Sequence, residues 1–557
     1  MSASSKKKLR KEQESELLTE RQRTERKEAK KLKTYTILFI TVMVLIVVLA
    51  AGILIGRWVT TSGYAERNTP ALTVGEHTLS NAEFSYYYMD TINSTYTSWK
   101  NTYGEYASMY LSLMGLDLTK PLDEQVYNQE TGETWTDYFV QTALDNVRNT
   151  YAVYDAAVAE GYTLSEDELA DVDAAVESME TVGKVYHGYS DLERYLKATY
   201  GYGASVESFR EYCLVTALAS SYQYAHSDSL SYTDEDIRAY DAEHAQEFNS
   251  YTYSSVYLNA NSFLTDGTVD EDGNVTYTDE QKAAALESAK AAADSLLSAD
   301  SQVLLDKLLG QVQLGTTAED EELTSTKSEE ILYSSINSAF QDWISDPARQ
   351  AGDITIIPNE STATNEDGSE TTTTYGYYVV LFEGSTDNTL PMGNVRHLLV
   401  AFEGGTTDEN DNTTYSDEEK AAAKTQAEEL LAQWQAGDAT EESFSELVKE
   451  NTDDTASAST GGLFENINPN SNYVEPFLNW ALESHQAGDT GIIETEYGYH
   501  IMYYVGDSEL NYRDAMIESR LRADDMTAWY DALVEATTVT ELDTSKVYRD
   551  IVLSSGA

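Results

Sequence analysis

The longest uninterrupted apolar run in the chain lies near its beginning. Residues 35–56, YTILFITVMVLIVVLAAGILIG, contain no charged side chain. As a helix, a run of this length spans about 33 Å, which is enough to cross the hydrocarbon core of a bilayer. No cysteine comes directly after the run, which excludes a lipid-anchored form, and the run is long for a cleaved signal peptide. The pattern therefore predicts a transmembrane signal anchor over residues 35–57.

Apolar residues at helical spacing dominate the next part of the chain, residues 58–248. The stretch 134–161 repeats apolar positions every three or four residues and stops at Gly161, and a helix is also expected after the cap residue Ser80. Tyrosines are frequent on these helices. Tyrosine gives a wide contact surface with one polar tip, so this block is either an ordinary helical core or a cradle for peptides.

From about residue 249 short alternating strands flank the helices, and the pattern repeats. TYTDEQKAAALESAKAAADSLLSA (276–299) matches TYSDEEKAAAKTQAEELLAQWQAG (414–437). Later, AGDITIIP and YGYYVVLFEG in the first copy match AGDTGIIETEYGYHIMYYVG in the second. Several landmarks in one order indicate a duplicated unit of strand, helices and two strands. Each copy is predicted to be an α+β domain with helices packed on a small sheet.

Charge divides the chain at the apolar run. Residues 1–34 carry a net charge of +6, and the remainder carries −66. Basic residues favour the cytoplasmic side of a membrane, so residues 1–34 are expected in the cytoplasm and the bulk of the chain outside it. An acidic surface repels phosphates, so no nucleic acid is expected as a partner.

Composition also argues against metal chemistry and against any cofactor. Cys213 is the one cysteine, so a disulfide within the chain is impossible, and the seven histidines are scattered without ligand spacing. The acidic loops 265–277 and 406–415 lack the full order of a calcium-binding loop. We expect no metal site and no cofactor.

The second copy carries the candidate chemistry. His397 lies in the strand NVRHLLVAF (394–402), and His500 lies near the start of the last strand. If these strands are neighbours, the two imidazoles lie side by side at the centre of the sheet. Between them come Asp453 and Asp454, then a Gly-Gly turn and the apolar segment NYVEPFLNW (472–480).

These elements resemble the parvulin family of peptidyl-prolyl isomerases over about residues 393–507. The resemblance rests on VRHLLV, EEKAAAKTQAEELLAQW, FSELVKENTDD, TGGLF, the PF of EPF, and AGD followed by YGYHI. With the helical block and the anchor, the whole chain is similar to PrsA-like and SurA-like extracytoplasmic foldases. It departs from PrsA-like proteins, which are usually lipoproteins, in having a transmembrane helix.

The resemblance implies roles for individual residues. It implies that His397, His500 and Asp454 are the catalytic groups, although the alignment leaves Asp453 as an alternative to Asp454. It also implies that the substrate contacts belong to Leu463, Tyr473, Val474, Phe477 and Tyr497. Isomerisation forms and breaks no covalent bond, so Asp454 is expected to support the histidines or to act on the amide electrostatically, and not as a nucleophile.

The first copy lacks these groups. Ser255 falls near the place of His397, Tyr378 takes the place of His500, and the Gly-Gly turn is missing. We therefore expect a degenerate parvulin-like domain that serves as a spacer or a surface for client polypeptides.

The predicted fold class is α+β and multidomain, with one N-terminal transmembrane helix, a SurA-like helical domain and two parvulin-like domains. The expected function is a membrane-anchored foldase that isomerises prolyl bonds in, and chaperones, unfolded exported polypeptides. A chaperone with a weak or inactive parvulin domain is the alternative, and a surface adhesin or stalk is a third. The predicted segments are a cytoplasmic tail (1–34), the anchor (35–57), the helical domain (58–248), the degenerate domain (249–388), the isomerase domain (389–508) and a C-terminal helix that could return to the helical domain (509–557).

Overall fold

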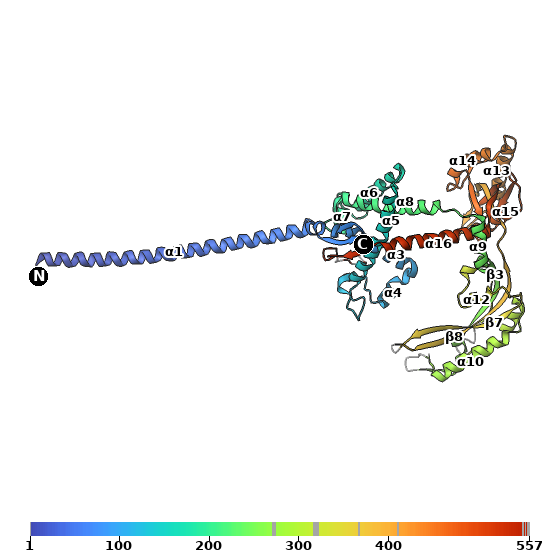
Figure 1. The fold of residues 1–557 in the computed structure, drawn as a ribbon, viewed down its shortest axis with the longest axis horizontal. Helices are drawn as coiled ribbons and strands as arrows, with labels where there is room; N and C mark the ends of the chain where they lie inside the picture. Colours follow the sequence, from blue (N-terminus) through green and yellow to red (C-terminus); the bar gives the residue numbers. More distant parts are fainter. Residues whose placement is uncertain are drawn as a thin grey trace. The chain divides into compact units, whose positions relative to one another are not determined.

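The computed structural model divides the chain into two compact units. One unit comprises Met1–Leu230 and Asp525–Ala557, and the other comprises Ser231–Asp524. The structure describes residues 2–269, 275–315, 322–365, 368–408, 412–548, 551 and 553. Figure 1 shows the fold and labels its elements. The predicted combination of helices and small sheets is confirmed.

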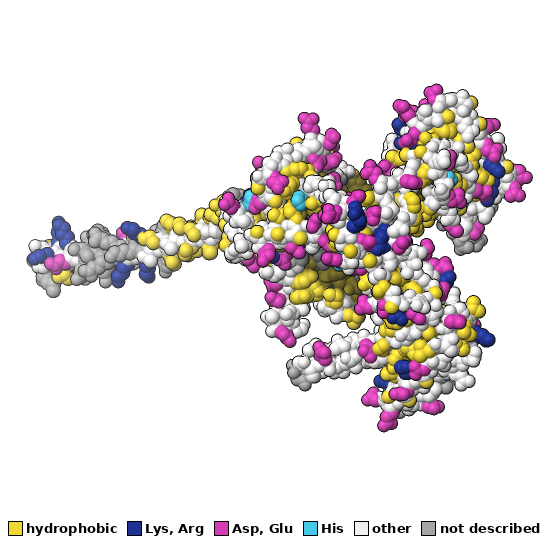
Figure 2. All heavy atoms as spheres, turned by 45° about the vertical axis from the view of Figure 1, so that its right-hand side comes forward, with side chains coloured by type: hydrophobic (Ala, Val, Ile, Leu, Met, Phe, Trp, Pro, Cys, Tyr) yellow, Lys and Arg dark blue, Asp and Glu magenta, His cyan; other side chains and the backbone are white. Residues whose placement is uncertain are grey.

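The first helix, α1 (Ala3–Thr61), contains the apolar run. Within it, Ile37–Arg57 has a mean hydropathy of 3.2 and no buried residue, so its length and composition suit a membrane crossing. Figure 2 shows this stretch as a run of hydrophobic side chains.

The helical unit is built around tyrosine, tryptophan and phenylalanine side chains. Trp135, Tyr86, Tyr88, Phe84 and Phe139 are among its fully buried residues. The cap predicted at Ser80 is present, because its side chain and that of Glu83 exchange hydrogen bonds with each other's backbone N–H. The helices of the unit after α1 are α2 (Tyr64–Asn68), α3 (Asn81–Tyr103), α4 (Ala107–Leu113), α5 (Trp135–Glu160), α6 (Glu166–Val185), α7 (Leu192–Tyr200) and α8 (Val206–Ser229).

The chain returns to this unit at its C-terminal end. The helix α16 (Tyr512–Ala536) carries Trp529, Tyr530 and Leu533, which pack against Ala157 and Tyr222 of the helical unit. The strand β15 (Val539–Glu541) then pairs with β1 (Pro70–Val74), which also pairs with β2 (His77–Ser80). The sequence left open whether the last helix joins the helical unit, and the structure shows that residues from Asp525 onwards do.

The second unit contains two four-stranded antiparallel sheets with the same strand topology. Their orders are β6-β3-β8-β7 in the first repeat and β12-β9-β14-β13 in the second. The strands are β3 (Ser250–Asn259), β6 (Thr326–Leu332), β7 (Ile354–Thr364), β8 (Glu370–Thr386), β9 (Pro391–Ala401), β12 (Leu463–Ile467), β13 (Thr490–Glu494) and β14 (Gly498–Asn511). The helices of the two repeats are α10 (Asp279–Leu296), α11 (Gln302–Leu309), α12 (Gln341–Ile344), α13 (Asp417–Gln435), α14 (Glu441–Asn451) and α15 (Glu475–Leu482).

The register of the central strands aligns the two repeats residue by residue. His500 lies opposite Leu399, and Tyr378 lies opposite Tyr257. His397 lies two residues before Leu399, and Ser255 lies two residues before Tyr257. Ser255 therefore occupies the position in the first repeat that His397 has in the second. The duplication proposed from the sequence is thus matched by the pairing of the strands.

The glycine of the YGY motif is retained in both repeats for a steric reason. Gly498 and Gly376 have φ values of 155° and 157°. A Cβ atom on Gly498 would lie 2.1 Å from the carbonyl oxygen of Val400, and one on Gly376 would lie 2.3 Å from that of Leu258. Each glycine allows the last strand to approach the first one, which is where the second repeat places its histidines.

One helix belongs to a different unit from the one that the sequence suggested. The helix α9 (Asp234–His244) was placed in the helical domain, and the structure places it in the unit of the repeats. Ile237 of α9 is buried with Phe248 and with Ile517 of α16. Arg513, which is almost fully buried, also binds the carboxylate of Asp241. These contacts with residues far away in the sequence hold α9 against the repeats. The sequence pattern of α9 alone therefore does not indicate to which unit it belongs.

Candidate active site

The two faces of the second repeat's sheet carry different layers. Leu398, Val400 and Ile501 face a core that includes Trp434 from α13 and Phe444 from α14. Val395 and Met502 point the other way and pack against Phe477 and Ala481 of α15. Because side chains alternate along a strand, His397 and His500 belong to the face covered by α15. Both rings lie in the two central strands and are almost fully buried.

The buried imidazoles form one continuous hydrogen-bonded chain. The Nδ1 atoms of His397 and His500 lie 3.0 Å apart. On one side, Nε2 of His397 lies 3.0 Å from Oδ2 of Asp454. On the other side, Nε2 of His500 lies 2.9 Å from Oγ1 of Thr495. Ser457 adds a donor to the same Asp454 oxygen, with an O–O distance of 2.5 Å.

The two neighbouring aspartates have different partners. Asp454 contacts His397, whereas the carboxylate of Asp453 accepts a hydrogen bond from the backbone N–H of Ala401. Thr452 accepts hydrogen bonds from the backbone N–H groups of both Asp454 and Leu399, which ties this loop to the strand β9. Of the two alternatives left by the sequence, the structure brings Asp454 to the histidines.

Burial keeps the histidines uncharged. Loss of hydration lowers the pKa of His397, and the nearby Asp454 carboxylate offsets part of that effect. Loss of hydration and the neighbouring His397 lower the pKa of His500 to about 4. Burial alone would raise the pKa of Asp454, but the hydrogen bond from Ser457 and the contact with His397 outweigh it and hold that pKa below its ordinary value. At neutral pH the group therefore consists of two neutral imidazoles and one carboxylate.

This charge state fixes the direction of each hydrogen bond that links Asp454, the two histidines and Thr495. An ionised carboxylate only accepts, so Nε2–H of His397 donates to Asp454. A neutral imidazole has one donor, so Nδ1 of His397 accepts, and the donor is Nδ1–H of His500. Nε2 of His500 then accepts from the hydroxyl of Thr495. All donors point toward Asp454, so the carboxylate sets the tautomer of both rings.

A glycine pair holds His397 in place. Gly461 and Gly462 have φ values of 65° and 69°. The backbone N–H of His397 donates to the carbonyl of Gly462 at 2.9 Å, and a Cβ atom on Gly462 would lie 2.1 Å from the carbonyl oxygen of His397. Only a residue without a side chain allows this approach. The TGGLF turn thus connects the edge strand β12 to the histidine.

Aromatic rings cover the hydrogen-bonded pair of histidines. The ring of Phe477 lies 5.3 Å from that of His397 and 5.8 Å from that of His500, measured between centroids. Phe464 lies 5.0 Å from His397, and Tyr473 lies 5.2 Å from Phe477. Tyr473 is 37% exposed, so the aromatic layer extends from the buried rings to the surface. Such a surface suits an apolar ring such as that of proline.

The structure separates the sequence-predicted contact residues into two groups. Phe477 and Tyr473 lie at the histidines, and Val474 packs beside Phe477 at the start of α15. Leu463 pairs with Arg396, so the side chain of Leu463 lies on the face of the sheet away from the histidines. Phe464, the next residue, contacts His397 in the place that was predicted for Leu463. Tyr497 is 57% exposed and connects to the network through its backbone N–H, which donates to Thr495.

Three residues of the site were not predicted. Phe464 follows the glycine pair by two positions, and a shift of one residue in a strand reverses the face it occupies. Ser457 and Thr495 are short polar residues in connecting segments. A search for hydroxyl residues near the two histidine strands could have suggested Thr495, which is five residues before His500 in the same hairpin.

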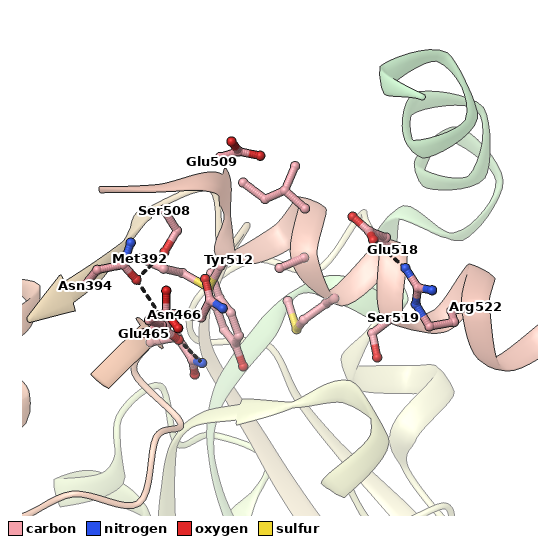
Figure 3. A pocket seen from close by; sticks show the side chains of 14 residues that line it. Met392, Asn394, Glu465, Asn466, Ser508, Glu509, Tyr512, Glu518, Ser519 and Arg522 are labelled. Carbon is pink, nitrogen blue, oxygen red and sulfur yellow. Dashed lines mark hydrogen bonds and ion pairs between the residues drawn. The ribbon is translucent and has the colours of Figure 1, made fainter. Parts of the chain in front are cut away.

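A separate cavity lies elsewhere in this unit. It has a volume of about 830 Å³ and is lined by residues of β9, of β12 and the turn after it, of the end of β14 and of α16. Figure 3 shows the amide oxygen of Asn394 bound by Ser508 and Asn466, and Arg522 paired with Glu518. Neither the two histidines nor Asp454 line this cavity. The histidine network and its aromatic cover, by contrast, form the candidate active site.

Within the described residues, no group of three or more histidine, cysteine, aspartate or glutamate side chains is placed to hold a metal ion.

Comparisons with known proteins find similarity over the part of the chain that contains the site. Residues 397–506 match the model of the rotamase family, described as the PPIC-type PPIASE domain. The foldase protein PrsA 1 of Listeria monocytogenes is 34% identical over 96 residues, which are 16% of this chain and 32% of that relative. The chain thus spans about a third of the length of this curated relative.

Two solved structures are similar over longer ranges but at lower identity. The peptidylprolyl isomerase PrsA of Bacillus anthracis has 19% identity and a TM-score of 0.16, over 27% of this chain and 59% of that one. PrsA of Bacillus subtilis has 14% identity and a TM-score of 0.26, over 74% of this chain and 89% of that one. TM-scores this low establish no shared arrangement of the whole chains.

The low pKa of His500 predicts that acid destabilises the fold. The ordinary histidine pKa is about 6.5, so between pH 6.5 and 4 the unfolded chain binds a proton that the folded chain excludes. The free energy of unfolding should therefore fall as the pH drops through this window, by up to about 3 kcal/mol for this residue. Urea titrations at several pH values, followed by tryptophan fluorescence, measure this free energy of unfolding. It should depend less on pH in His500→Gln than in the unmodified chain. His187 is exposed, so His187→Gln is the control. The same pH dependence in His500→Gln as in the unmodified chain would contradict the lowered pKa of His500.

Residues 397–506, which contain the histidine network, thus match the PPIC-type PPIASE domain of the rotamase family, and a 96-residue part of the chain is similar to a PrsA foldase.

Proposed function

We propose that the protein is a foldase that catalyses cis–trans isomerisation of prolyl peptide bonds in unfolded polypeptides, at His397, His500 and Asp454. The observation that carries the proposal is the buried chain of uncharged imidazoles ending on one carboxylate beneath an aromatic layer. The homologous Listeria protein is itself named a foldase.

The reaction needs no nucleophile and no proton transfer to substrate. Rotation about the prolyl bond is slow because amide resonance gives a barrier of roughly 20 kcal/mol. A catalyst lowers this barrier by stabilising the twisted amide more than the planar one. In the planar amide, resonance places negative charge on the oxygen and positive charge on the nitrogen. An apolar surrounding disfavours this charge-separated form and so favours the twisted state.

The site supplies such a surrounding and one fixed charge. Phe477, Phe464 and Tyr473 offer an apolar surface for the proline ring. Asp454 is partly exposed, with 23% of its side chain accessible, so its charge can act on a bound amide. A carboxylate repels the partly negative oxygen of a planar amide, and this repulsion weakens as the amide twists. The histidines hold Asp454 in position and keep their own donors directed at it.

The first repeat is proposed to be inactive. Ser255 and Tyr378 stand at the positions of the two histidines, so no imidazole chain can form there. The fold is retained because the strand pairing and the glycine of the YGY motif are retained. All isomerase activity is then assigned to the second repeat.

Substitutions in the network should remove the activity. His397→Ala or His500→Ala leaves the other ring with an unpaired buried nitrogen, and we expect kcat/KM to fall at least tenfold. The measurement is a protease-coupled assay of the full chain with a short chromogenic peptide that contains one prolyl bond. His485→Ala is the matched control, because His485 is a partly buried ring that stacks on Trp480 in the same domain and makes no contact with the network.

The same assay distinguishes the proposal from the alternative. A chaperone with a catalytically weak domain would suppress aggregation of an unfolded test protein, such as reduced α-lactalbumin, without an isomerase rate. An unmodified chain that shows no rate contradicts the enzymatic proposal. An unmodified chain with neither effect would favour a structural role such as an adhesin.

We further propose that the chain is anchored by Ile37–Arg57, with its N-terminus in the cytoplasm and both compact units outside it. The support is the apolar span and the excess of basic residues before it. Protease added to intact cells or protoplasts should then degrade residues 59–557 and leave the first 34 residues protected. Protection of the C-terminal part would contradict this topology.

A further inference from the structure

The first repeat has an open groove that the proposed catalysis does not use. Its volume is about 730 Å³, and it lies against the strands β3 and β8 and the segment that leads into α12. Four aromatic side chains line it: Tyr253, Tyr257, Phe340 and Tyr378. The groove is therefore a cavity within one repeat and does not depend on contacts between the two compact units.

The groove occupies the position of the active site in the second repeat. Ser255 and Tyr378 line it, and these residues stand where the second repeat has His397 and His500. Phe340 begins the sequence FQDW, which corresponds to FLNW beginning at Phe477. Phe340 contacts the ring of Tyr378 at 5.5 Å, as Phe477 contacts that of His500 at 5.8 Å. The aromatic floor is thus retained while the imidazoles are replaced.

The walls of the groove are ordered by contacts among the rings. Tyr257 and Tyr378 lie 4.8 Å apart between centroids, and Tyr253 lies 5.7 Å from Phe340. The hydroxyl of Tyr257 accepts a hydrogen bond from Asn359. Rings held in this way keep their faces in place without a ligand, which lowers the entropy that a ligand must lose with them.

The remaining lining combines the apolar Val256 and Leu323 with polar groups and is almost uncharged. Ser255, Asn337 and Ser338 offer hydroxyl and amide groups, which suit the carbonyls and N–H groups of an extended backbone. Among the described lining residues Glu322 is the one charged side chain. Aromatic grooves with hydrogen-bonding rims are the surfaces that bind proline-rich extended segments, because these segments expose a rigid apolar ring and free backbone carbonyls. The carboxylate favours a segment with basic residues beside the proline.

We propose that this groove is a second binding site for proline-containing, extended segments of the client polypeptide, with a preference for flanking lysine or arginine, and that it binds them without isomerising them. The inference rests on the proposed function only in taking an unfolded polypeptide as the ligand. A chain with one binding repeat and one catalytic repeat holds a client at two points, which raises the effective concentration of its prolyl bonds at the catalytic repeat.

The test uses the full chain in lipid nanodiscs and a photo-reactive peptide. The probe is biotin-Gly-Lys-photoleucine-Pro-Lys-Gly, and cross-linked segments are identified by mass spectrometry. We expect cross-links at 253–257, 333–340 or 378 in addition to those within 397–506. The same peptide with alanine in place of proline, or with glutamate in place of both lysines, should give at least fivefold fewer cross-links in the first repeat.

Two substitutions fill the groove from opposite walls. Ser255→Trp acts from β3, and Ser338→Trp acts from the segment before α12, where Ser338 is exposed. Either should lower cross-linking in the first repeat at least tenfold and leave kcat/KM for the short peptide within twofold. Ser361→Trp, at an exposed position of β7 outside the groove, is the matched control and should change neither. Circular dichroism shows whether each variant is folded, and one folded variant is enough for the test.

The outcomes separate this inference from the proposed function. Cross-links confined to 397–506, or cross-links in the first repeat that both groove-filling variants retain, would overturn the second binding site. Equal cross-linking by the alanine peptide would overturn the preference for proline. First-repeat cross-links in a chain without isomerase activity would support the second site while contradicting the catalytic proposal.

Discussion

The active repeat depends on one hydrogen bond between two buried imidazoles. Nδ1 of His397 and Nδ1 of His500 lie 3.0 Å apart, and this contact is favourable only while at least one of the two atoms lacks a proton. Burial supplies that condition, since it makes a charged imidazole costly in both positions. Every neighbouring feature then has a defined role. Asp454 accepts at one end, Thr495 donates at the other, and the Gly461–Gly462 turn positions His397.

The two repeats show what this contact requires and what it does not. Both copies have the same strand pairing and the glycine of the YGY motif. Both also have a phenylalanine against the central strands, Phe340 in the first copy and Phe477 in the second. The histidines, their acidic partner and the Gly-Gly turn occur in the second copy. A tyrosine at position 378 fits the first copy because Tyr257 and Phe340 pack against its ring. The scaffold is thus independent of the network, and loss of the network leaves an aromatic groove.

Sequence reasoning was most informative where local chemistry decides the structure. The cap predicted at Ser80 is present, because such a cap depends on residues only three positions apart. The sequence offered the pairing of the His397 and His500 strands only as a condition for the two rings to meet, and the structure shows that the strands are neighbours. The choice between Asp453 and Asp454, the role of Phe464 in place of Leu463, and the membership of α9 in the second unit could not be predicted. These depend on the course of a turn or on contacts between residues far apart in the chain.

Both histidines are neutral, and all donors of the network point toward Asp454. This arrangement is tested most directly by nitrogen NMR of the full chain labelled with ¹⁵N only at its seven histidines, with His397→Gln and His500→Gln used for assignment. At pH 7 His397 should carry its proton on Nε2, and His500 should carry its proton on Nδ1. A doubly protonated ring at either position at pH 7, or the reverse pair of tautomers, would contradict this arrangement.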